Sequence, residues 1–271
     1  MKNILEAPFI KEMCETAENL YRHGWDERNG GNISYILDEA EVGKYLDVKD
    51  VKREIPMIFN AENLADKYFI VTGTGRYFKN VMAHPSENMG IVRVQKNGQK
   101  LDLLWGLENG ILPTSELPSH FMTHISRLSV DLENKVVIHC HATHLLAMSF
   151  THSLDARDFT RRLWQMCTEC LVVFPDGVAV LPWIVPGTNE IGEATAESMK
   201  AHRLVIWPFH GVYGTGKDLD ETYGLIETAE KAAEVYTYVQ AQGGVKQAIT
   251  DQNLKDLAAA FHVMPVPGYL D

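Results

Sequence analysis

Two histidines, His139 and His141, stand two residues apart at the end of a β-branched run, and this spacing suits a shared metal ion. Side chains at positions i and i+2 of a strand point to the same face of a sheet. Neutral imidazole nitrogen is a good zinc ligand, and catalytic zinc sites commonly use three protein ligands and leave one position open. The alternative is that both histidines are ordinary polar side chains at a strand end.

A third metal ligand has to come from another part of the chain. His210 follows a second apolar run and precedes Gly211, so it could reach into a cleft, although a structural role would also explain it. His144 is a rival ligand three residues after His141. We expect it in the first turn of the following helix, where its side chain would point in a different direction from the strand pair.

Two further pairs have spacings that occur in metal sites. His120 and His124 are four residues apart on a predicted helix, a spacing that can bind zinc, but no third partner is evident. We therefore predict one solvent-facing histidine and one core histidine. Cys167 and Cys170 form an isolated C-x-x-C without a second pair, which predicts ordinary reduced thiols.

The segment 113–118, Pro-Thr-Ser-Glu-Leu-Pro, has the composition of a helix N-terminus. Thr114 or Ser115 could cap the helix, Glu116 would interact favourably with the helix dipole, and proline is tolerated in the first turn. The same groups could also hold a phosphate and supply an acid or base beside a metal ion.

Two loops contain small residues that suit an anion. They are Asn29-Gly30-Gly31-Asn32 and Gly73-Thr74-Gly75, and each could also be a plain turn. Together they offer backbone N–H groups and short polar side chains. Neither matches the P-loop or the dinucleotide-binding fingerprint.

Helices and strands are expected to interleave along the chain. Helical periodicity predicts helices over 10–22, 115–129, 143–150, 156–168, 189–201, 220–241 and 253–261. Apolar and β-branched runs predict strands over 33–37, 68–72, 89–94, 101–105, 135–140 and 204–207. Asn97-Gly98 is a strong hairpin signal, and 171–174 and 178–181 flank a second turn at 175–177.

This order of elements predicts an α/β protein of one domain, residues 1–271, because no linker divides it. With at least two hairpins, the central sheet should be mixed and largely antiparallel, with helices flanking it. The polar segment 38–66 is expected to be an extended excursion rather than part of the core.

Composition excludes several classes of protein. The formal net charge is −11, which argues against a nucleic-acid binder and against attraction to an anionic membrane. The four cysteines are too few for a disulfide framework, and no apolar run suits a signal peptide or a membrane span. We expect a cytoplasmic protein, and the net charge does not exclude an anionic small-molecule substrate, because local N–H groups can hold a phosphate.

Five motifs in fixed order resemble those of the class II aldolase/adducin family, and the resemblance covers nearly the whole chain. The motifs are Gly30-Gly31-Asn32, Thr72-Gly73-Thr74-Gly75, Ser115-Glu116 with His120, His139-Cys140-His141 and His210-Gly211. Longer stretches at 24–32, 113–118, 168–177 and 207–211, together with the segment 38–66, are similar to one aldolase of that family.

The resemblance implies a three-layer αβα fold and a zinc-dependent lyase that cleaves a ketose phosphate by retro-aldol chemistry. It implies one Zn²⁺ per subunit on His139, His141 and His210, with Glu116 as the catalytic acid or base. It also implies a C4 homotetramer with active sites between subunits. Glu169 would then contribute from the adjacent subunit.

The resemblance further implies a site for the substrate phosphate. Its residues would be Asn29, Asn32, Thr74, Gly75 and Ser115. Thr74 stands where serine is expected, and it keeps the hydroxyl group. Alternatives within the family are a sugar-phosphate 4-epimerase, which has aspartate at the position of Glu116, and a dehydratase of a methylthio sugar phosphate. The non-enzyme alternative is an adducin-like assembly domain, which needs none of the three histidines.

Overall fold

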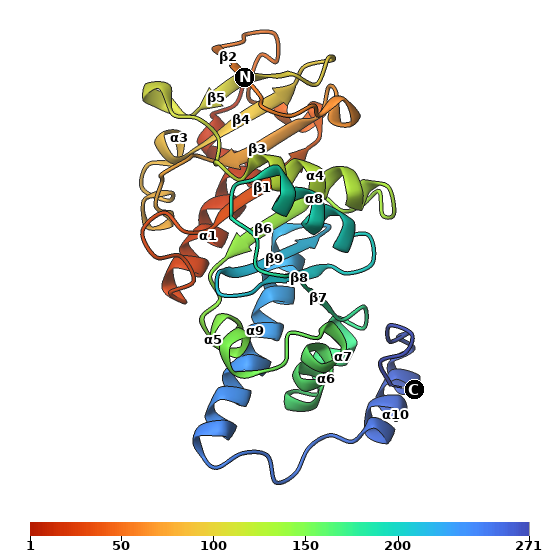
Figure 1. The fold of residues 1–271 in the computed structure, drawn as a ribbon. Coiled ribbons are helices and arrows are strands. Elements are labelled where there is room, and N and C mark those ends of the chain that lie inside the picture. The colour runs from red at the N-terminus through yellow and green to blue at the C-terminus, as the bar shows by residue number, and fades with distance from the viewer. Residues whose placement is uncertain (271) are drawn as a thin grey trace.

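The computed structural model describes residues 1–270, and their nine strands form one sheet in the order β2-β5-β4-β3-β1-β6-β9-β8-β7 (Figure 1). The strands are β1 Asn32–Leu37, β2 Arg53–Pro56, β3 Tyr68–Thr72, β4 Met89–Val94, β5 Lys100–Gly106, β6 Val136–Cys140, β7 Val178–Val180, β8 Leu204–Trp207 and β9 Gly211–Gly216. Within the described chain every neighbouring pair is antiparallel except β7 and β8. The predicted mixed, largely antiparallel sheet in one α/β domain is confirmed.

Helices cover both faces of the sheet, as predicted (Figure 1). They are α1 Pro8–Arg22, α2 Glu39–Val42, α3 Pro85–Asn88, α4 Leu117–Leu128, α5 Thr143–Thr151, α6 Ala156–Met166, α7 Glu169–Val173, α8 Asn189–Ser198, α9 Leu219–Ala241 and α10 Asp251–Phe261. Short 3₁₀ turns are η1 Ile4–Glu6, η2 Glu62–Leu64, η3 Phe78–Asn80 and η4 Glu108–Gly110. None of the helices within residues 1–270 is both long enough and apolar enough to cross a bilayer.

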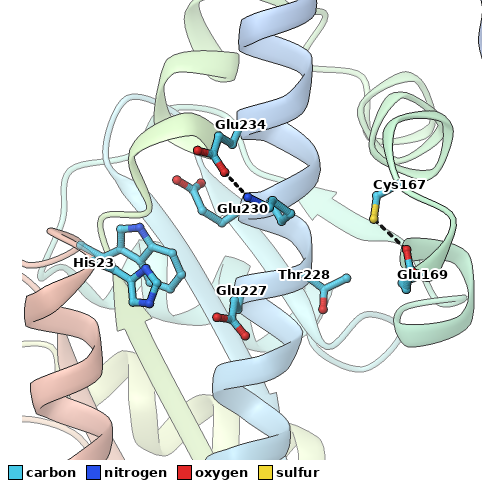
Figure 2. A pocket seen from close by; sticks show the side chains of 9 residues that line it. His23, Cys167, Glu169, Glu227, Thr228, Glu230 and Glu234 are labelled. Atoms are coloured by element: carbon cyan, nitrogen blue, oxygen red, sulfur yellow. Dashed lines mark hydrogen bonds and ion pairs between the residues drawn. The ribbon is translucent and has the colours of Figure 1, made fainter.

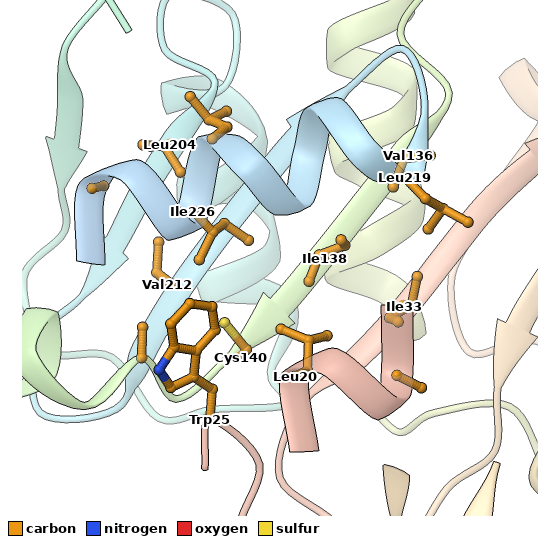
Figure 3. Packing of buried hydrophobic residues seen from close by; sticks show 14 of the residues in the cluster. Leu20, Trp25, Ile33, Val136, Ile138, Cys140, Leu204, Val212, Leu219 and Ile226 are labelled. Atoms are coloured by element: carbon orange, nitrogen blue, oxygen red, sulfur yellow. The ribbon is translucent and has the colours of Figure 1, made fainter. Parts of the chain in front are cut away.

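The alternation of β6 assigns its side chains to the two faces. Val136, Ile138 and Cys140 are buried in the core beneath α1 and α9, as Figure 3 shows. Val137 packs in the opposite core, against α8. His139 follows the alternation to this second face, because successive strand side chains point in opposite directions. The strand therefore separates an apolar layer from the layer that carries chemistry.

The segment 38–66 does contribute to the core, so its prediction as an excursion was wrong. It contains the short helix α2 and the edge strand β2, and it buries Val42, Ile55 and Leu64. Its apolar residues are widely spaced among polar ones because an edge strand and short turns each bury few side chains. The sequence pattern was therefore too sparse to reveal them.

The region around the turn at 175–177 also differs from the prediction. Residues 171–174 lie largely in α7 rather than in a strand, and β7 pairs in parallel with β8 instead of forming a hairpin. The turn itself is present, with Gly177 at φ 65°. A further strand, β9, was not predicted, because three of its six residues are glycine and glycine has a low preference for strands.

Candidate active site

The antiparallel order of the central strands brings four chain segments to one edge of the sheet. The first residue of β1, Asn32, pairs with His139 near the end of β6. Cys140 pairs with Val212 at the start of β9, and β9 is joined to β8 by the turn that carries His210. β3 also ends here, because it runs antiparallel to β1. The site is thus a product of strand direction and register.

His139, His141 and His210 come together at this edge. Their ring centroids are 4.9 to 5.3 Å apart, and each offers a ligand atom within 4.8 Å of the other two. Three nitrogens on a tetrahedral zinc lie roughly 3.4 Å from one another. Small side-chain rotations would therefore bring the three rings to one cation.

Hydrogen bonds behind the rings turn free nitrogens toward the centre. The Nδ1 of His139 donates to the carbonyl of Val212 at 3.0 Å, which leaves its Nε2 buried and without a partner among residues 1–270. The Nδ1 of His141 donates to the Glu27 carboxylate at 2.8 Å. Second partners of this kind fix the tautomer and orientation of histidine ligands in metal sites. The donor set therefore fits a divalent cation.

The electrostatic surroundings of His139 and His210 favour the neutral imidazole, which is the form that binds a metal. Burial, reinforced by His141, lowers the pKa of His139 well below its ordinary value. Burial and the neighbouring His139 lower the pKa of His210 to about 4. Burial alone would raise the pKa of Glu27, but the hydrogen bond from His141, a backbone hydrogen bond and the charges of His141 and His210 together outweigh it, and the pKa is lowered. Neutral rings with free lone pairs are ready to bind a cation.

Two glycines allow the backbone to approach the rings closely. A Cβ added at Gly30 would lie 2.8 Å from Cε1 of His141. One added at Gly211 would lie 2.4 Å from the Cys140 carbonyl oxygen and 3.1 Å from the ring of His139. Both positions therefore require glycine for space. Gly30 and Gly211 each belong to one of the sequence motifs, and this is their steric role there.

Glu116 points its carboxylate toward the histidine cluster from the start of α4. Its Oε2 lies 3.7 Å from Nε2 of His139 and accepts hydrogen bonds from Nδ2 of Asn32 at 2.9 Å and from the Tyr213 hydroxyl at 3.1 Å. Burial and the Glu116 charge raise the pKa of Tyr213 well above its ordinary value, so the phenol keeps its proton and donates. Only 8% of Glu116 is exposed.

The helix-cap prediction for 113–118 needs correction. Glu116 itself is the N-cap residue of α4, and no side chain caps the helix. The hydroxyl of Thr114 instead accepts a hydrogen bond from the Glu116 amide at 3.2 Å. The segment therefore positions a carboxylate toward the cluster, which the residue types alone did not reveal.

One cavity of about 200 Å³ unites the histidines, Glu116 and the residues expected to bind phosphate. Its lining consists of Asn29, Gly30, Gly31, Asn32, Gly73, Thr74, Gly75, Thr114, Ser115, Glu116, His139, His141 and His210. Backbone hydrogen bonds from Thr74 to Leu112 and from Thr114 to Thr72, each 2.9 Å long, hold the loop 73–75 beside the segment that leads into α4. Small polar groups thus lie beside the histidine cluster.

Glu169 lies elsewhere. Its exposed side chain lines a different cavity, together with His23 and Cys167 (Figure 2). The Cys167 thiol donates to the Glu169 carboxylate at 2.9 Å, and all four cysteines are free thiols in this structure. His144 bonds Glu230 at 2.8 Å and is not in the histidine cluster, in agreement with its lower ranking as a ligand.

His120 and His124 are both completely buried, so the prediction that one of them faces solvent was wrong. They contact the same Ser34 hydroxyl, which is itself buried in β1. Sequence reasoning also missed Glu27 and Tyr213 as parts of the site. Glu27 stood in a quoted motif without a role, and Tyr213 lies three residues after His210 in the unpredicted strand β9.

Comparison with known proteins finds aldolases both among sequence relatives and among solved structures. The chain is 66% identical over 270 residues to rhamnulose-1-phosphate aldolase from Listeria monocytogenes serotype 4a, covering 100% of this chain and 99% of the relative. It is 68% identical over 269 residues to the enzyme of the same name from Enterococcus faecalis, covering 99% and 96%. The structure of a sugar-phosphate aldolase from Thermotoga maritima superposes with a TM-score of 0.75 and 31% identity, covering 87% of this chain and 96% of that one.

The family model described as the class II aldolase and adducin N-terminal domain matches residues 11–237. That range contains every residue of the cavity described above. The expected resemblance is therefore confirmed by relatives along the whole chain and by the fold. The chain belongs to the class II aldolase and adducin family.

Proposed function

We propose that this chain is a zinc-dependent aldolase that cleaves L-rhamnulose 1-phosphate to dihydroxyacetone phosphate and L-lactaldehyde in the breakdown of L-rhamnose. Full-length relatives at 66% and 68% identity bear the name of that aldolase. The observation that carries the proposal is one cavity in which three converging imidazoles face a buried carboxylate beside two polar loops.

The metal would be held by His139, His141 and His210. Three imidazole nitrogens with an open fourth position are a donor set typical of catalytic zinc. A bound divalent cation supplies Lewis acidity, which stabilises the negative charge left on the substrate oxygens when the carbon–carbon bond breaks. The neutral state of His139 and His210 favours this binding.

Glu116 would carry the proton that is exchanged with the substrate carbon. In cleavage it gives a proton to C3 of the ketose, and in condensation it removes that proton. The hydrogen bonds from Asn32 and Tyr213 both meet its Oε2. No group within residues 1–270 donates to Oε1, so this oxygen is free to face the substrate.

The substrate phosphate would be held at the loop side of the cavity. Asn29, Asn32, Thr74, Gly75 and Ser115 line the cavity and would bind the phosphate, and Asn32 also donates to Glu116. Hydroxyls and backbone N–H groups bind phosphate without any cationic side chain. This arrangement would admit the sugar phosphate despite a net charge of −11.

We also propose a cytoplasmic homotetramer with active sites between subunits, in which Glu169 acts on the neighbour's substrate. Glu169 is exposed and does not line the histidine cavity of its own chain. A catalytic role for it therefore needs an adjacent subunit. Subunit mixing tests this. Glu116→Gln and Glu169→Gln, each nearly inactive alone, should regain activity when unfolded and refolded together, whereas each refolded alone should not.

The experiment that tests the whole function is a coupled assay that reduces dihydroxyacetone phosphate as it forms. The phosphates of rhamnulose, fuculose and ribulose are compared, and the largest kcat/KM is expected for L-rhamnulose 1-phosphate. Release of free dihydroxyacetone phosphate separates cleavage from 4-epimerisation and from dehydration. Absence of turnover with zinc-loaded protein on all three sugars would reject the aldolase.

A further inference from the structure

We propose that His120, Ser34 and His124 form a one-way hydrogen-bond chain that fixes the amide of Asn32 and through it positions Glu116. The inference rests on the proposed catalytic role of Glu116. None of the three chain residues lines the cavity, so they act as positioning residues rather than as groups that touch substrate. All three are completely buried between β1 and α4.

The contacts form an unbroken path of five groups. Nε2 of His124 lies 2.7 Å from the Ser34 hydroxyl, and that hydroxyl lies 2.7 Å from Nδ1 of His120. Nε2 of His120 is hydrogen bonded to Oδ1 of Asn32. Nδ2 of Asn32 reaches Oε2 of Glu116 at 2.9 Å. The path therefore runs from the interior of α4 to the carboxylate in the cavity.

The donor-to-acceptor direction of every hydrogen bond in the path follows from the Glu116 carboxylate at its end. A carboxylate accepts, so the Asn32 amide must turn its N–H₂ to Glu116 and its oxygen to His120. Nε2 of His120 then has to donate. Burial lowers the pKa of this histidine well below its ordinary value, so the ring carries one proton and its Nδ1 accepts.

The remaining two links have the same direction. The Ser34 hydroxyl donates to Nδ1 of His120, and its oxygen is left to accept from Nε2 of His124. Burial lowers the pKa of His124 to about 3, so this ring is also neutral. Its Nδ1 is buried without a partner among the described residues, as expected for a lone pair in an apolar layer. Every donor in the path points toward Glu116.

The functional consequence lies in the Asn32 amide, whose two ends have almost the same shape but opposite hydrogen bonding. If it turned over, its oxygen would face the oxygen of Glu116, and the carboxylate would have to move away. Without Ser34, Nδ1 of His120 loses its donor, the Nε2–H tautomer is held from the Glu116 side alone, and this reversal becomes more accessible. The chain thus stabilises one orientation of the catalytic carboxylate, where displacements of about 1 Å affect rate strongly.

Ser34→Ala is the main test, with Thr123→Val as the matched control. Thr123 is buried on the same helix as His124, but its hydroxyl has no hydrogen-bond partner among residues 1–270. For Ser34→Ala we expect bound zinc and KM to stay unchanged while kcat falls by up to about tenfold, the size expected when one hydrogen bond between neutral groups is lost. Exchange of the hydroxymethyl proton of dihydroxyacetone phosphate in D₂O should slow in parallel. Thr123→Val should change none of these quantities.

A pair of variants at His120 keeps the test independent of packing. His120→Phe removes the donor to Asn32 and should lower kcat by a similar factor. His120→Gln restores an amide N–H close to the position of Nε2 and should recover most of the rate. Equal rates for the two variants, or full activity of Ser34→Ala, would overturn the proposal.

Histidine ¹⁵N spectra test the chain without reference to activity. The wild type should contain His120 as the Nε2–H tautomer alone, and Ser34→Ala should contain both tautomers. An Nδ1–H tautomer of His120 in the wild type would sink the proposal. If the wild type lacked aldolase activity but showed the expected tautomer, the proposed function would fail while the chain itself stood.

Discussion

Two groups of histidines lie on the same face of the sheet, and they differ in what their ring nitrogens contact. In the first group, His139, His141 and His210, free nitrogens face one another across the cavity. In the second, His120 and His124, a serine hydroxyl lies between the rings. Burial lowers the pKa of His139 and His210 in the first group and of both histidines in the second.

The difference teaches that residue spacing does not identify a metal site. Both i,i+2 on a strand and i,i+4 on a helix are spacings that bind zinc. The two groups differ in their hydrogen-bond partners. In the first group, the nitrogens that converge have no hydrogen-bond partner among residues 1–270, whereas in the second group both rings are hydrogen bonded to Ser34. Buried polar atoms are seldom left unpaired, so unpaired nitrogens that converge point to a missing ligand.

The largest expected effect comes from removing a ligand of the first group. His141→Ala should abolish stoichiometric zinc and lower turnover to background, because two ligands cannot hold the ion tightly. Metal analysis and the coupled assay measure both quantities. His84→Ala, at an exposed histidine outside the cavity, is the control and should keep both. Full zinc content in His141→Ala would show that the ligand set is wrong.

Glu116 is where the two groups meet, and its replacement should separate chemistry from metal binding. Glu116→Gln keeps the size of the side chain but cannot exchange a proton. Turnover should fall by about 100- to 10,000-fold, the usual contribution of a general acid or base, with zinc retained. Metal analysis and single-turnover rates give the two numbers. Turnover close to that of the wild type would remove Glu116 from the mechanism.

The partner behind His141 should have a smaller effect on the metal. Glu27→Gln removes the carboxylate that accepts from Nδ1 of His141. Such partners contribute about 10- to 100-fold in metal affinity, and we expect the lower end because the Glu27 side chain is 70% exposed. Competition with a chromophoric chelator measures the affinity. An unchanged dissociation constant would mean that His141 needs no partner.

The second group should have the smallest effect, on the pH dependence of stability. The folded pKa of His124 is about 3, against an ordinary value of 6.5. Between these values the unfolded chain binds a proton that the folded chain does not. Stability therefore falls as pH is lowered through this range, by up to about 1.4 kcal/mol per pH unit for one histidine.

His124→Phe should reduce that slope in urea unfolding at pH 7, 6 and 5, at fixed protein concentration. Phenylalanine preserves the ring packing against Phe69, where the two centroids are 5.2 Å apart. Thr123→Val removes no titratable group, so its slope should match that of the wild type even if its stability is lower. A slope unchanged by His124→Phe would mean that this histidine is not held neutral by folding.

Much of the fold could be predicted because its strongest signals are local. β3, β4, β6 and β8 are continuous apolar runs, and the long helix α9 has a clear end before Gly243. The strand that was not predicted, β9, contains glycine where α9 packs closely against it. A Cβ at Gly214 would lie 2.7 Å from Ile226 of α9. Glycine is required there because of the helix that packs on the strand, so the sequence of the strand alone does not indicate it.

The site was predicted unevenly for a similar reason. The residues expected at the cavity from the family motifs do line it, with the exception of Glu169. The partners of these residues were not predictable, because Val212, Glu27 and Tyr213 act through register and loop conformation. Burial of both His120 and His124 depends on how α4 sits against β1, which periodicity does not determine.

The thiol of Cys140 lies between His139 and His141 in sequence but on the opposite side of the sheet, fully enclosed by the core under α9. A sulfur so close in sequence would otherwise compete for the ion or be attacked by peroxides that reach the cavity. Strand alternation keeps it from both, and burial raises its pKa, so it stays an unreactive thiol. The protein should therefore tolerate oxidants and alkylating agents at this position without losing its metal.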